Sequence, residues 1–251
     1  MSRFLRYPRL PEKQVSWVLV SGEYPWLKQC LQQQGLNVLT TREEQRLPGP
    51  VRYHPDLQVC PFSFEQMFVL KTNSLLEELH SLGFQVYETQ AEPEGQYPRD
   101  VLCGGFLWQS CFVGNPKGVD RSIQDMVTQQ RIHFLPVRQG YGACSVALVN
   151  EHCAITADEG LEQALTAKGF TVLLIRPGHI ELPGYDTGFI GGCCGKLGPN
   201  ELAFAGELSC HPDGDRIRSF LKEQKVNPIE LELRKGPLLD VGGILPLLEQ
   251  D

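Results

Sequence analysis

The feature that most constrains the fold of this chain is a short joint that recurs five times along its 251 residues. At each joint a helical pattern ends at a glycine or a basic residue, and a run of β-branched or aromatic residues follows at once. Glycine suits this position because the residue after a helix often adopts a positive φ. The five joints are at Gly35, Gly83, Arg131, Gly169 and Lys225. Their spacings of 48, 48, 38 and 56 residues indicate a repeat architecture.

Each repeat is expected to contain a strand, often a second strand, a helix and a further strand, which predicts an α/β fold. The helices are expected over residues 24–34, 72–82, 118–130, 159–168 and 213–224. Strands are expected to follow them at 37–40, 84–87, 132–135, 170–175 and 229–233. The earlier strands of the repeats are expected at 15–20, 57–60, 101–103, 110–113, 143–149, 152–156, 187–190 and 201–205.

The length of the chain allows one large domain with ample material for a core. We expect a single domain over residues 1–251. Its repeats are expected at roughly 12–48, 49–92, 93–139, 140–180 and 181–251.

A second repeated feature is an aspartate just before the first strand of a repeat. It occurs as Asp56, Asp100, Asp186 and Asp240, whereas the fourth repeat has Gly140-Tyr-Gly142 there. In a closed ring of repeats, equivalent strand starts meet near the axis, where four carboxylates would form a cation site. The alternative is that each aspartate only begins its strand through an Asx turn.

The charge balance narrows the classes of partner. The chain has 23 basic and 30 acidic residues, a formal net charge of −7. This composition argues against a general binder of nucleic acid or of anionic membranes, both of which need a basic face. It is compatible with a small cationic ligand, and no motif indicates a cofactor or an oligomeric state.

The cysteines and the hydropathy pattern bear on the compartment. The nine cysteines are scattered, the first residues lack the pattern of a secretory signal, and no segment reaches the ~20 apolar residues of a membrane span. We therefore expect a cytoplasmic protein with reduced thiols.

Several short motifs are shared with a known family. Residues 100–105 and 111–114 resemble a hairpin in the third repeat of the pentein fold, and residues 143–146 with 154–156 resemble the fourth-repeat hairpin. Asp186–Gly192 resembles the fifth-repeat strand, and Asp240–Pro246 resembles the closing glycine-rich strand that completes the first blade. The resemblance implies a five-bladed β/α propeller of ββαβ repeats around a pseudo-five-fold axis. The family includes arginine, agmatine and dimethylarginine hydrolases and amidinotransferases.

The chemistry of that family needs three groups. A thiolate attacks the guanidinium carbon, a histidine moves protons to and from the leaving amine, and carboxylates clamp the planar cation. In this chain the place of the family cysteine holds Leu245 or Pro246, and the region of the family histidine is Gln139-Gly-Tyr-Gly142. The carboxylate at Asp100 is present.

The resemblance therefore implies a pseudoenzyme that binds a small guanidino- or amine-bearing ligand through Asp56, Asp100 and Asp186. One alternative is an atypical hydrolase or amidinotransferase with a relocated catalytic group, for which Cys144 and His179 are the candidates. Cys144 is otherwise a small buried hydrophobe, and His179 a loop residue without a role. A further alternative is a protein-interaction ring without a small ligand, because a fold does not fix a function.

Two other motifs do not predict sites. Cys193 and Cys194, with Cys210 and His211, lack the spacing of a zinc knuckle, and adjacent residues of a strand point to opposite faces. We expect no metal there. The glycine-rich segment at 191–195 is not followed by a predicted helix, which a phosphate-binding loop requires.

Overall fold

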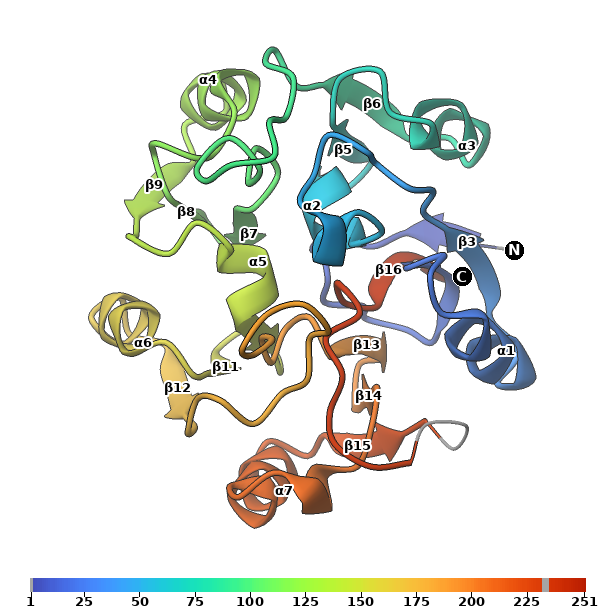
Figure 1. Ribbon diagram of the computed structural model, residues 1–251, viewed down its shortest axis with the longest axis vertical. Coiled ribbons are helices and arrows are strands. Elements are labelled where there is room, and N and C mark those ends of the chain that lie inside the picture. The colour runs from blue at the N-terminus through green and yellow to red at the C-terminus, as the bar shows by residue number, and fades with distance from the viewer. Residues whose placement is uncertain (1, 232–234) are drawn as a thin grey trace.

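The computed structural model describes residues 2–231 and 235–251, and its strands form five separate sheets. Figure 1 shows the sheets side by side around the middle of the molecule, with the longer helices on the outside. One sheet has four strands and the other four have three each. The mixed α/β class predicted from the sequence is therefore confirmed.

Four of the sheets share one plan. An antiparallel hairpin is followed by an outer helix, and the helix leads to a third strand that is parallel to the second. The second repeat contains β4 (Val59–Ser63), β5 (Gln66–Val69), α3 (Leu75–Ser81) and β6 (Gln85–Glu88). The third contains β7 (Phe106–Trp108), β8 (Cys111–Gly114), α4 (Arg121–Gln129) and β9 (His133–Pro136). The fourth contains β10 (Val146–Leu148), β11 (Cys153–Thr156), α6 (Glu159–Thr166) and β12 (Thr171–Leu174). The fifth contains β13 (Cys194–Gly198), β14 (Glu201–Phe204), α7 (Gly214–Glu223) and β15 (Asn227–Glu230).

The remaining sheet joins the two ends of the chain. Its order is β1 (Ser2–Phe4), β16 (Leu245–Gln250), β2 (Val15–Val20) and β3 (Asn37–Thr40), with α1 (Pro25–Gln33) between β2 and β3. The last strand, β16, is antiparallel to both β1 and β2. It thus takes the place that the first strand of the hairpin has in the other sheets.

The backbone at the five joints follows the sequence prediction. All five adopt positive φ, with values of 84° at Gly35, 93° at Gly83, 57° at Arg131, 90° at Gly169 and 57° at Lys225. The two basic joints adopt the left-handed conformation despite having a side chain, which indicates that the turn from helix to strand requires it.

The strands expected at 15–20 and 201–205 begin where the sequence predicted, whereas those expected from 57 and 143 begin later, at Val59 and Val146. Residues 57–58 belong to a short helix, α2 (Pro55–Gln58), and residues 142–145 form another, α5 (Gly142–Ser145). The expected strands at 101–103 and 187–190 are turns and loops. A run of three or four apolar residues is buried in either conformation, so periodicity could not distinguish a strand from a helical turn. The expected strand at 229–233 is present at Ile229 and Glu230, Leu231 lies beyond its end, and residues 232–233 lie outside the described residues.

Two further elements are single 3₁₀ turns, η1 (Gly49–Val51) and η2 (Leu208–Cys210). Among the described residues the longest helix is α7, with 10 residues. Within the described ranges no helix is long and apolar enough to cross a membrane.

Five clusters of buried side chains form the core, and each packs between two sheets. Four of them lie between sheets that are consecutive in sequence; for example, Phe62 of β4 and Phe112 of β8 share one cluster. The fifth cluster joins the last sheet to the first, with Ala203 of β14 packed in the same cluster as Val18 of β2 and Leu31 of α1. Each sheet therefore buries side chains against two neighbours.

A buried carboxylate fixes the N-terminal segment to the last strand. Glu249 of β16 is fully buried, and its Oε2 accepts hydrogen bonds from the backbone N–H groups of Glu12 and Lys13 at 2.7 and 2.9 Å. Its Oε1 lies 2.8 Å from the guanidinium of Arg3. These contacts connect residues at the two ends of the chain.

Replacing Glu249 with Ala is expected to lower the free energy of unfolding by about 2–4 kcal/mol, because two backbone donors lose their acceptor. Glu249→Gln keeps an acceptor oxygen and should lose less. Urea unfolding is the measurement, and Glu223→Ala on the exposed side of α7 is the control. A loss for Glu249→Ala no larger than the control's would contradict this account.

Candidate functional site

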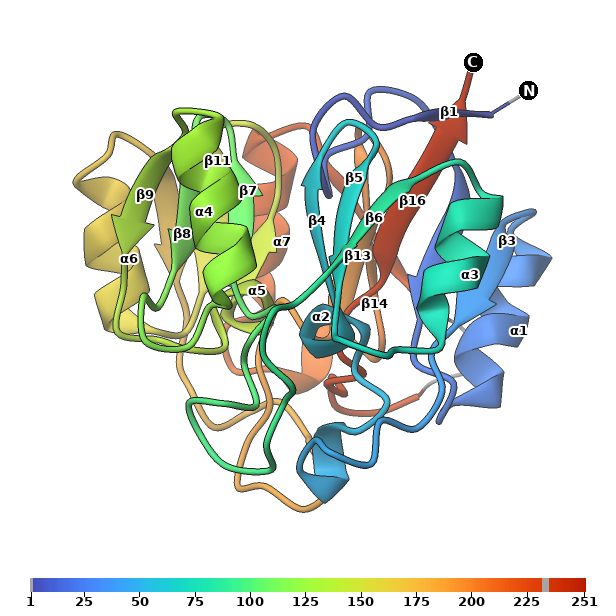
Figure 2. The same cartoon turned by 90° about the horizontal axis from the view of Figure 1, so that it is seen from above.

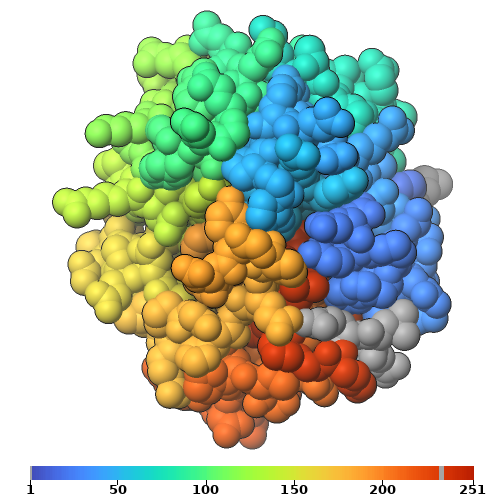
Figure 3. All heavy atoms as spheres, viewed as in Figure 1, coloured from blue at the N-terminus to red at the C-terminus, as the bar shows by residue number. Residues whose placement is uncertain are grey.

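Loops at one end of the inner strands enclose a cavity of about 120 Å³. Figure 3 shows that the segment around residues 180–190 covers the middle of this face of the molecule. The lining combines aromatic and aliphatic side chains with a histidine, a cysteine and a carboxylate. The lining residues are Val51, His54, Leu57, Tyr141, Cys144, Leu182, Tyr185, Thr187, Phe189 and Asp240.

The carboxylate of Asp240 is held rigidly. Its Oδ2 accepts a hydrogen bond from the backbone N–H of Phe189 at 2.8 Å, and its Oδ1 accepts one from Gly242 at 3.0 Å. A Cβ atom at Gly192 would lie 2.0 Å from Oδ1, and one at Gly188 would lie 2.5 Å from the Cβ of Asp240. Only glycine leaves room at these two places, so the glycine-rich sequence creates the space for the carboxylate.

Asp56 lies in the first turn of α2 and is buried beside the cavity. Its backbone N–H donates to the carbonyl of Gly242, whereas no described N–H or O–H group donates to its carboxyl oxygens, and the Cys144 thiol lies beside them. Burial raises the pKa of Asp56 well above its ordinary value, and the negative charge of Asp240 raises it further. The Cys144 thiol and the Arg9 guanidinium offset only part of this shift. A buried carboxyl group in this state retains its proton unless a cation arrives.

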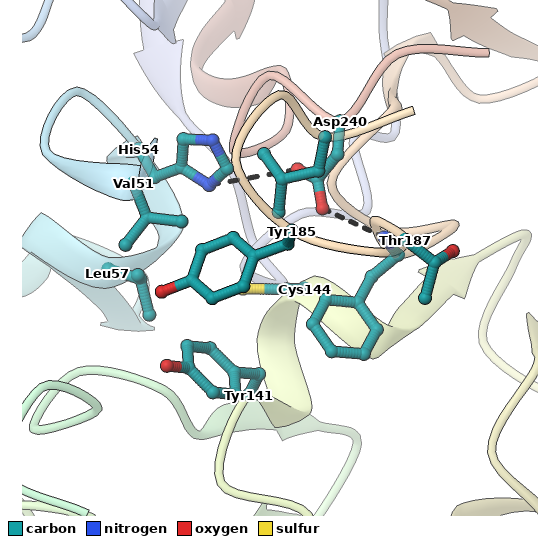
Figure 4. A pocket seen from close by; sticks show the side chains of 10 residues that line it. Val51, His54, Leu57, Tyr141, Cys144, Tyr185, Thr187 and Asp240 are labelled. Atoms are coloured by element: carbon teal, nitrogen blue, oxygen red, sulfur yellow. Dashed lines mark hydrogen bonds and ion pairs between the residues drawn. The ribbon is translucent and has the colours of Figure 1, made fainter. Parts of the chain in front are cut away.

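His54 caps α2 and lies between two carboxyl groups. Its Nδ1 is 3.7 Å from Asp240 and 3.9 Å from Asp56, and Figure 4 shows the ring directed toward Asp240. Its Nε2 is buried and has no partner among the described residues. Burial lowers the pKa of His54, and the charge of Asp240 opposes this shift only in part. The imidazole is therefore neutral near pH 7.

Asp100 supports an aromatic wall of the cavity. Its Oδ2 accepts a hydrogen bond from the Tyr141 hydroxyl, whereas its Oδ1 is buried without a partner in the described part of the chain. The Tyr141 ring is stacked between Tyr97 and Phe189, with ring centroids 6.2 and 5.8 Å apart. Burial and the Asp100 carboxylate raise the pKa of Tyr141, so the phenol stays protonated and remains a donor.

Cys144 lies in α5 and its thiol is fully buried. Burial raises its pKa well above the ordinary value, and the carboxyl groups of Asp56 and Asp240 raise it further. No hydrogen bond joins Cys144 to His54 in the portion of the chain that is described. A thiol surrounded by carboxyl groups is the opposite of an activated nucleophile, which needs a cationic or donor-rich environment.

The structure places the sequence-predicted residues in two groups. Asp56, Asp100 and Cys144 lie around the cavity, whereas Asp186 and His179 line a separate open groove of about 610 Å³. Leu182 and Tyr185 border both spaces, so the groove adjoins the cavity. His179 packs against the ring of His211, at a centroid distance of 5.6 Å.

The residues of the other sequence motifs make contacts within the fold. Leu245 begins β16, and Gln139 donates a hydrogen bond to Asp158. The thiols of Cys193 and Cys194 both contact the carbonyl of Ile190. Among the described residues no group of three or more potential ligands is arranged to hold a metal ion.

Sequence reasoning named Asp240 as one of four aspartates of a cation site but did not assign roles to His54, Tyr141, Tyr185 or Phe189, although all five line the cavity. A sequence signal existed for His54, which lies two residues before Asp56 in the repeated aspartate motif. The aromatic residues are typical of any core, so only the structure reveals their arrangement.

The chain is similar in structure to several enzymes that act on guanidino groups. The inosamine-phosphate amidinotransferase of Streptomyces griseus matches with a TM-score of 0.61 and 11% identity, over 99% of this chain and 98% of that one. DDAH from Pseudomonas aeruginosa, in a mutant form complexed with citrulline, matches with a TM-score of 0.56 and 9% identity, over 92% of this chain and 96% of that one. The amidinotransferase SxtG from Microseira wollei, of the saxitoxin biosynthetic pathway, matches with a TM-score of 0.54 and 12% identity, over 91% of both chains. These similarities show a mixed α/β fold that matches pentein structures, as the sequence motifs predicted.

Sequence comparisons give one family. A model described as "Family of unknown function (DUF6873)" matches residues 19–245. None of the curated proteins matches the sequence significantly.

Replacing Asp56 with Asn is expected to stabilise the protein at neutral pH. The raised pKa means that the folded state binds the Asp56 proton more tightly than the unfolded chain does. Stability of the unmodified protein therefore falls as pH rises from about 3.9, the ordinary pKa, through the raised pKa of the folded state. Asn has nearly the same shape and no charge, so the stability of the variant should not fall in this way as pH rises.

Urea unfolding at pH 4 and pH 8 measures the effect. The variant should be more stable by about 1–3 kcal/mol at pH 8 and nearly equal to the unmodified protein at pH 4. The exposed Asp215→Asn is the matched control. The same difference at both pH values would show that the Asp56 carboxyl group does not have a raised pKa.

Proposed function

The chain belongs to the family of unknown function DUF6873, and we propose that it binds a small guanidinium- or amine-bearing cation in the cavity between Asp240 and the aromatic walls, without turning it over. The observation that carries this proposal is the set of buried carboxyl oxygens to which no described N–H or O–H group donates, both of Asp56 and Oδ1 of Asp100, next to a cavity lined by Asp240. Buried polar groups are normally hydrogen-bonded, and buried charges are normally paired. A ligand with several N–H donors and a positive charge supplies both the missing hydrogen bonds and the counter-charge.

The aromatic side chains support the same class of ligand. Tyr141, Tyr185 and Phe189 line the cavity, and the face of an aromatic ring attracts a cation within about 6 Å of its centroid. A cavity of about 120 Å³ suits the head of a ligand rather than a whole amino acid. The adjoining groove, with Asp186 on its wall, is where the remainder of a longer ligand would lie.

The absence of turnover is inferred from the thiol and its surroundings. The family mechanism needs a thiolate, and the residues at the corresponding place, Leu245 and Pro246, carry no nucleophile. Cys144 lines the cavity, but its raised pKa keeps it a thiol at neutral pH. A clamp without an activated nucleophile binds a guanidinium group and leaves it intact.

The proposal includes the closed pentein ring, in which the five sheets surround a pseudo-five-fold axis and the acidic loops meet on it. The core cluster that joins the last sheet to the first supports this arrangement. The location of α2 and α5 near the middle of Figure 1 supports it as well.

Isothermal titration with arginine, agmatine and citrulline tests the proposal. Arginine and citrulline differ only in that a neutral ureido group replaces the cation, so arginine or agmatine should bind and citrulline should not. Binding should release protons and strengthen as pH rises, because the cation favours ionised Asp56, whose pKa is raised in the free protein. Asp240→Asn should weaken binding at least about tenfold, since hydrogen bonds to charged groups contribute about 1.5–3 kcal/mol.

Asp215→Asn, on the exposed side of α7, is the control and should leave binding unchanged. Asp186→Asn reports whether the groove takes part. If none of the three compounds binds, the proposal fails and the molecule is better described as a protein-interaction ring. Equal binding of arginine and citrulline would show that charge does not drive recognition.

Thiol labelling separates binding from catalysis by a relocated cysteine. Cys144 is expected to react with a disulfide reagent at neutral pH much more slowly than Cys210, which is exposed. Cys210→Ser should remove the fast phase, and Cys144→Ala should leave it intact. Fast labelling of Cys144, or release of ammonia from arginine or agmatine, would favour the hydrolase alternative.

A further inference from the structure

Arg9 is a buried cation whose hydrogen bonds are incomplete. Its side chain enters the interior among the inner strands, where Nη2 lies 3.5 Å from the carbonyl oxygen of Val146 in β10. Nη1 is buried without a partner in the described structure, and no carboxylate there forms an ion pair with the guanidinium. The guanidinium carbon is 5.8 Å from the centroid of the Phe106 ring. Arginine keeps its charge in proteins, so this group cannot avoid the deficit by losing a proton.

The backbone holds Arg9 in this place despite strain. The N–H of Leu10 donates to the carbonyl of Tyr7, which closes a turn with Pro8 and Arg9 at its centre. The φ of Arg9 is 67°, which a type II turn requires at this position and which normally selects glycine or asparagine. Figure 2 shows this N-terminal segment, just after β1, crossing the ends of the strands opposite α2. The guanidinium thus reaches the interior from the side opposite the acidic loops.

Lys196 of β13 is a second buried cation in the same region. Its Nζ donates to the carbonyl oxygens of Val149 and Pro199, at 3.0 and 2.7 Å, so one of its three donors remains. No described carboxylate lies within ion-pair distance of it. Burial lowers the pKa of Lys196 to about 8, and the charge of Glu201, which is beyond ion-pair distance, opposes this shift only in part.

Arg9 and Lys196 line one small cavity, of about 10 Å³, together with residues of β10, β13 and β14 and the start of β16. We propose that this cavity is a binding site for a single small monovalent anion such as chloride, held between the Arg9 guanidinium and the Lys196 ammonium group. An anion there supplies the acceptor that Nη1 lacks and a counter-charge at ion-pair distance, which neither cation has among the described residues.

The dimensions decide the class of anion. A space of about 10 Å³ is close to the lower limit for one water molecule, so a single monatomic anion enters it only if the lining side chains move slightly. Sulfate and phosphate are too large for it. A water molecule in the cavity would supply an acceptor but no charge. In that case Tm should not depend on which salt is present.

Thermal unfolding in sodium chloride, compared with sodium gluconate and sodium sulfate at equal ionic strength, tests the proposal. An anion that binds only the folded state should raise Tm saturably, by about 2–4 °C when chloride is about five times its Kd. Bromide should replace chloride, whereas gluconate and sulfate should lack this increment. Equal Tm values in the salts at all concentrations would overturn the proposal and leave water as the occupant.

Two substitutions assign the effect to this cavity. Arg9→Gln and Lys196→Met should each reduce or abolish the chloride-specific rise in Tm, whereas Arg138→Gln, at an exposed position, should retain it. Crystals of the unmodified protein grown in bromide provide a measurement that does not depend on the variants folding. An anomalous bromide peak beside Nη1 of Arg9 is the expected result. A chloride effect that persists in both variants, with bromide only at the surface, would show a non-specific salt effect.

Discussion

The pairing of the last strand with the first is the interaction on which the rest of the structure depends. β16 lies between β1 and β2, so the sheet that begins the chain is complete only when its end has returned. The residues just before β16 include Asp240, and the turn at Gly242 and Gly243 leads directly from this carboxylate into the strand. A Cβ atom at Gly242 would lie 2.5 Å from the Cα of His54, so the turn also fixes the distance to α2. Pairing of β16 with β1 and β2 therefore also positions Asp240 and α2 at the cavity.

The protein keeps charged groups of both signs in its interior and separates them. The carboxyl groups of Asp56, Asp100 and Asp240 lie in loops and a short helix that precede the inner strands, whereas Arg9 and Lys196 lie among the strands themselves. None of these five side chains is more than 9% exposed. Burial of this kind opposes stability, and it is typical of places where a protein binds or transforms a ligand.

The sequence predicted the outer part of the molecule better than its centre. The five joints at Gly35, Gly83, Arg131, Gly169 and Lys225 combine amphipathic helices with a specific backbone requirement, and both signals are local. The inner segments carry only short apolar runs, and their conformation is set by close approach to other segments. Gly192 against Asp240 is an example, because the contact joins residues 48 positions apart. The aspartate motif brought attention to Asp56 and Asp100, but it could not show that Asp186 faces a different space.

One buried cation and one buried carboxyl group, on opposite sides of the inner strands, influence each other across the interior of the molecule. The Arg9 guanidinium lowers the pKa of Asp56, although burial and Asp240 outweigh it, so the two regions interact through the protein interior. Such an interaction is reciprocal, because the free energy that couples two sites is the same from either side. A change that leaves Asp56 ionised therefore stabilises the buried positive charge of Arg9. Any change that neutralises or screens Arg9 makes the carboxyl groups harder to ionise. The acidic loops and the Arg9 turn are therefore coupled electrostatically, although they lie on opposite sides of the inner strands.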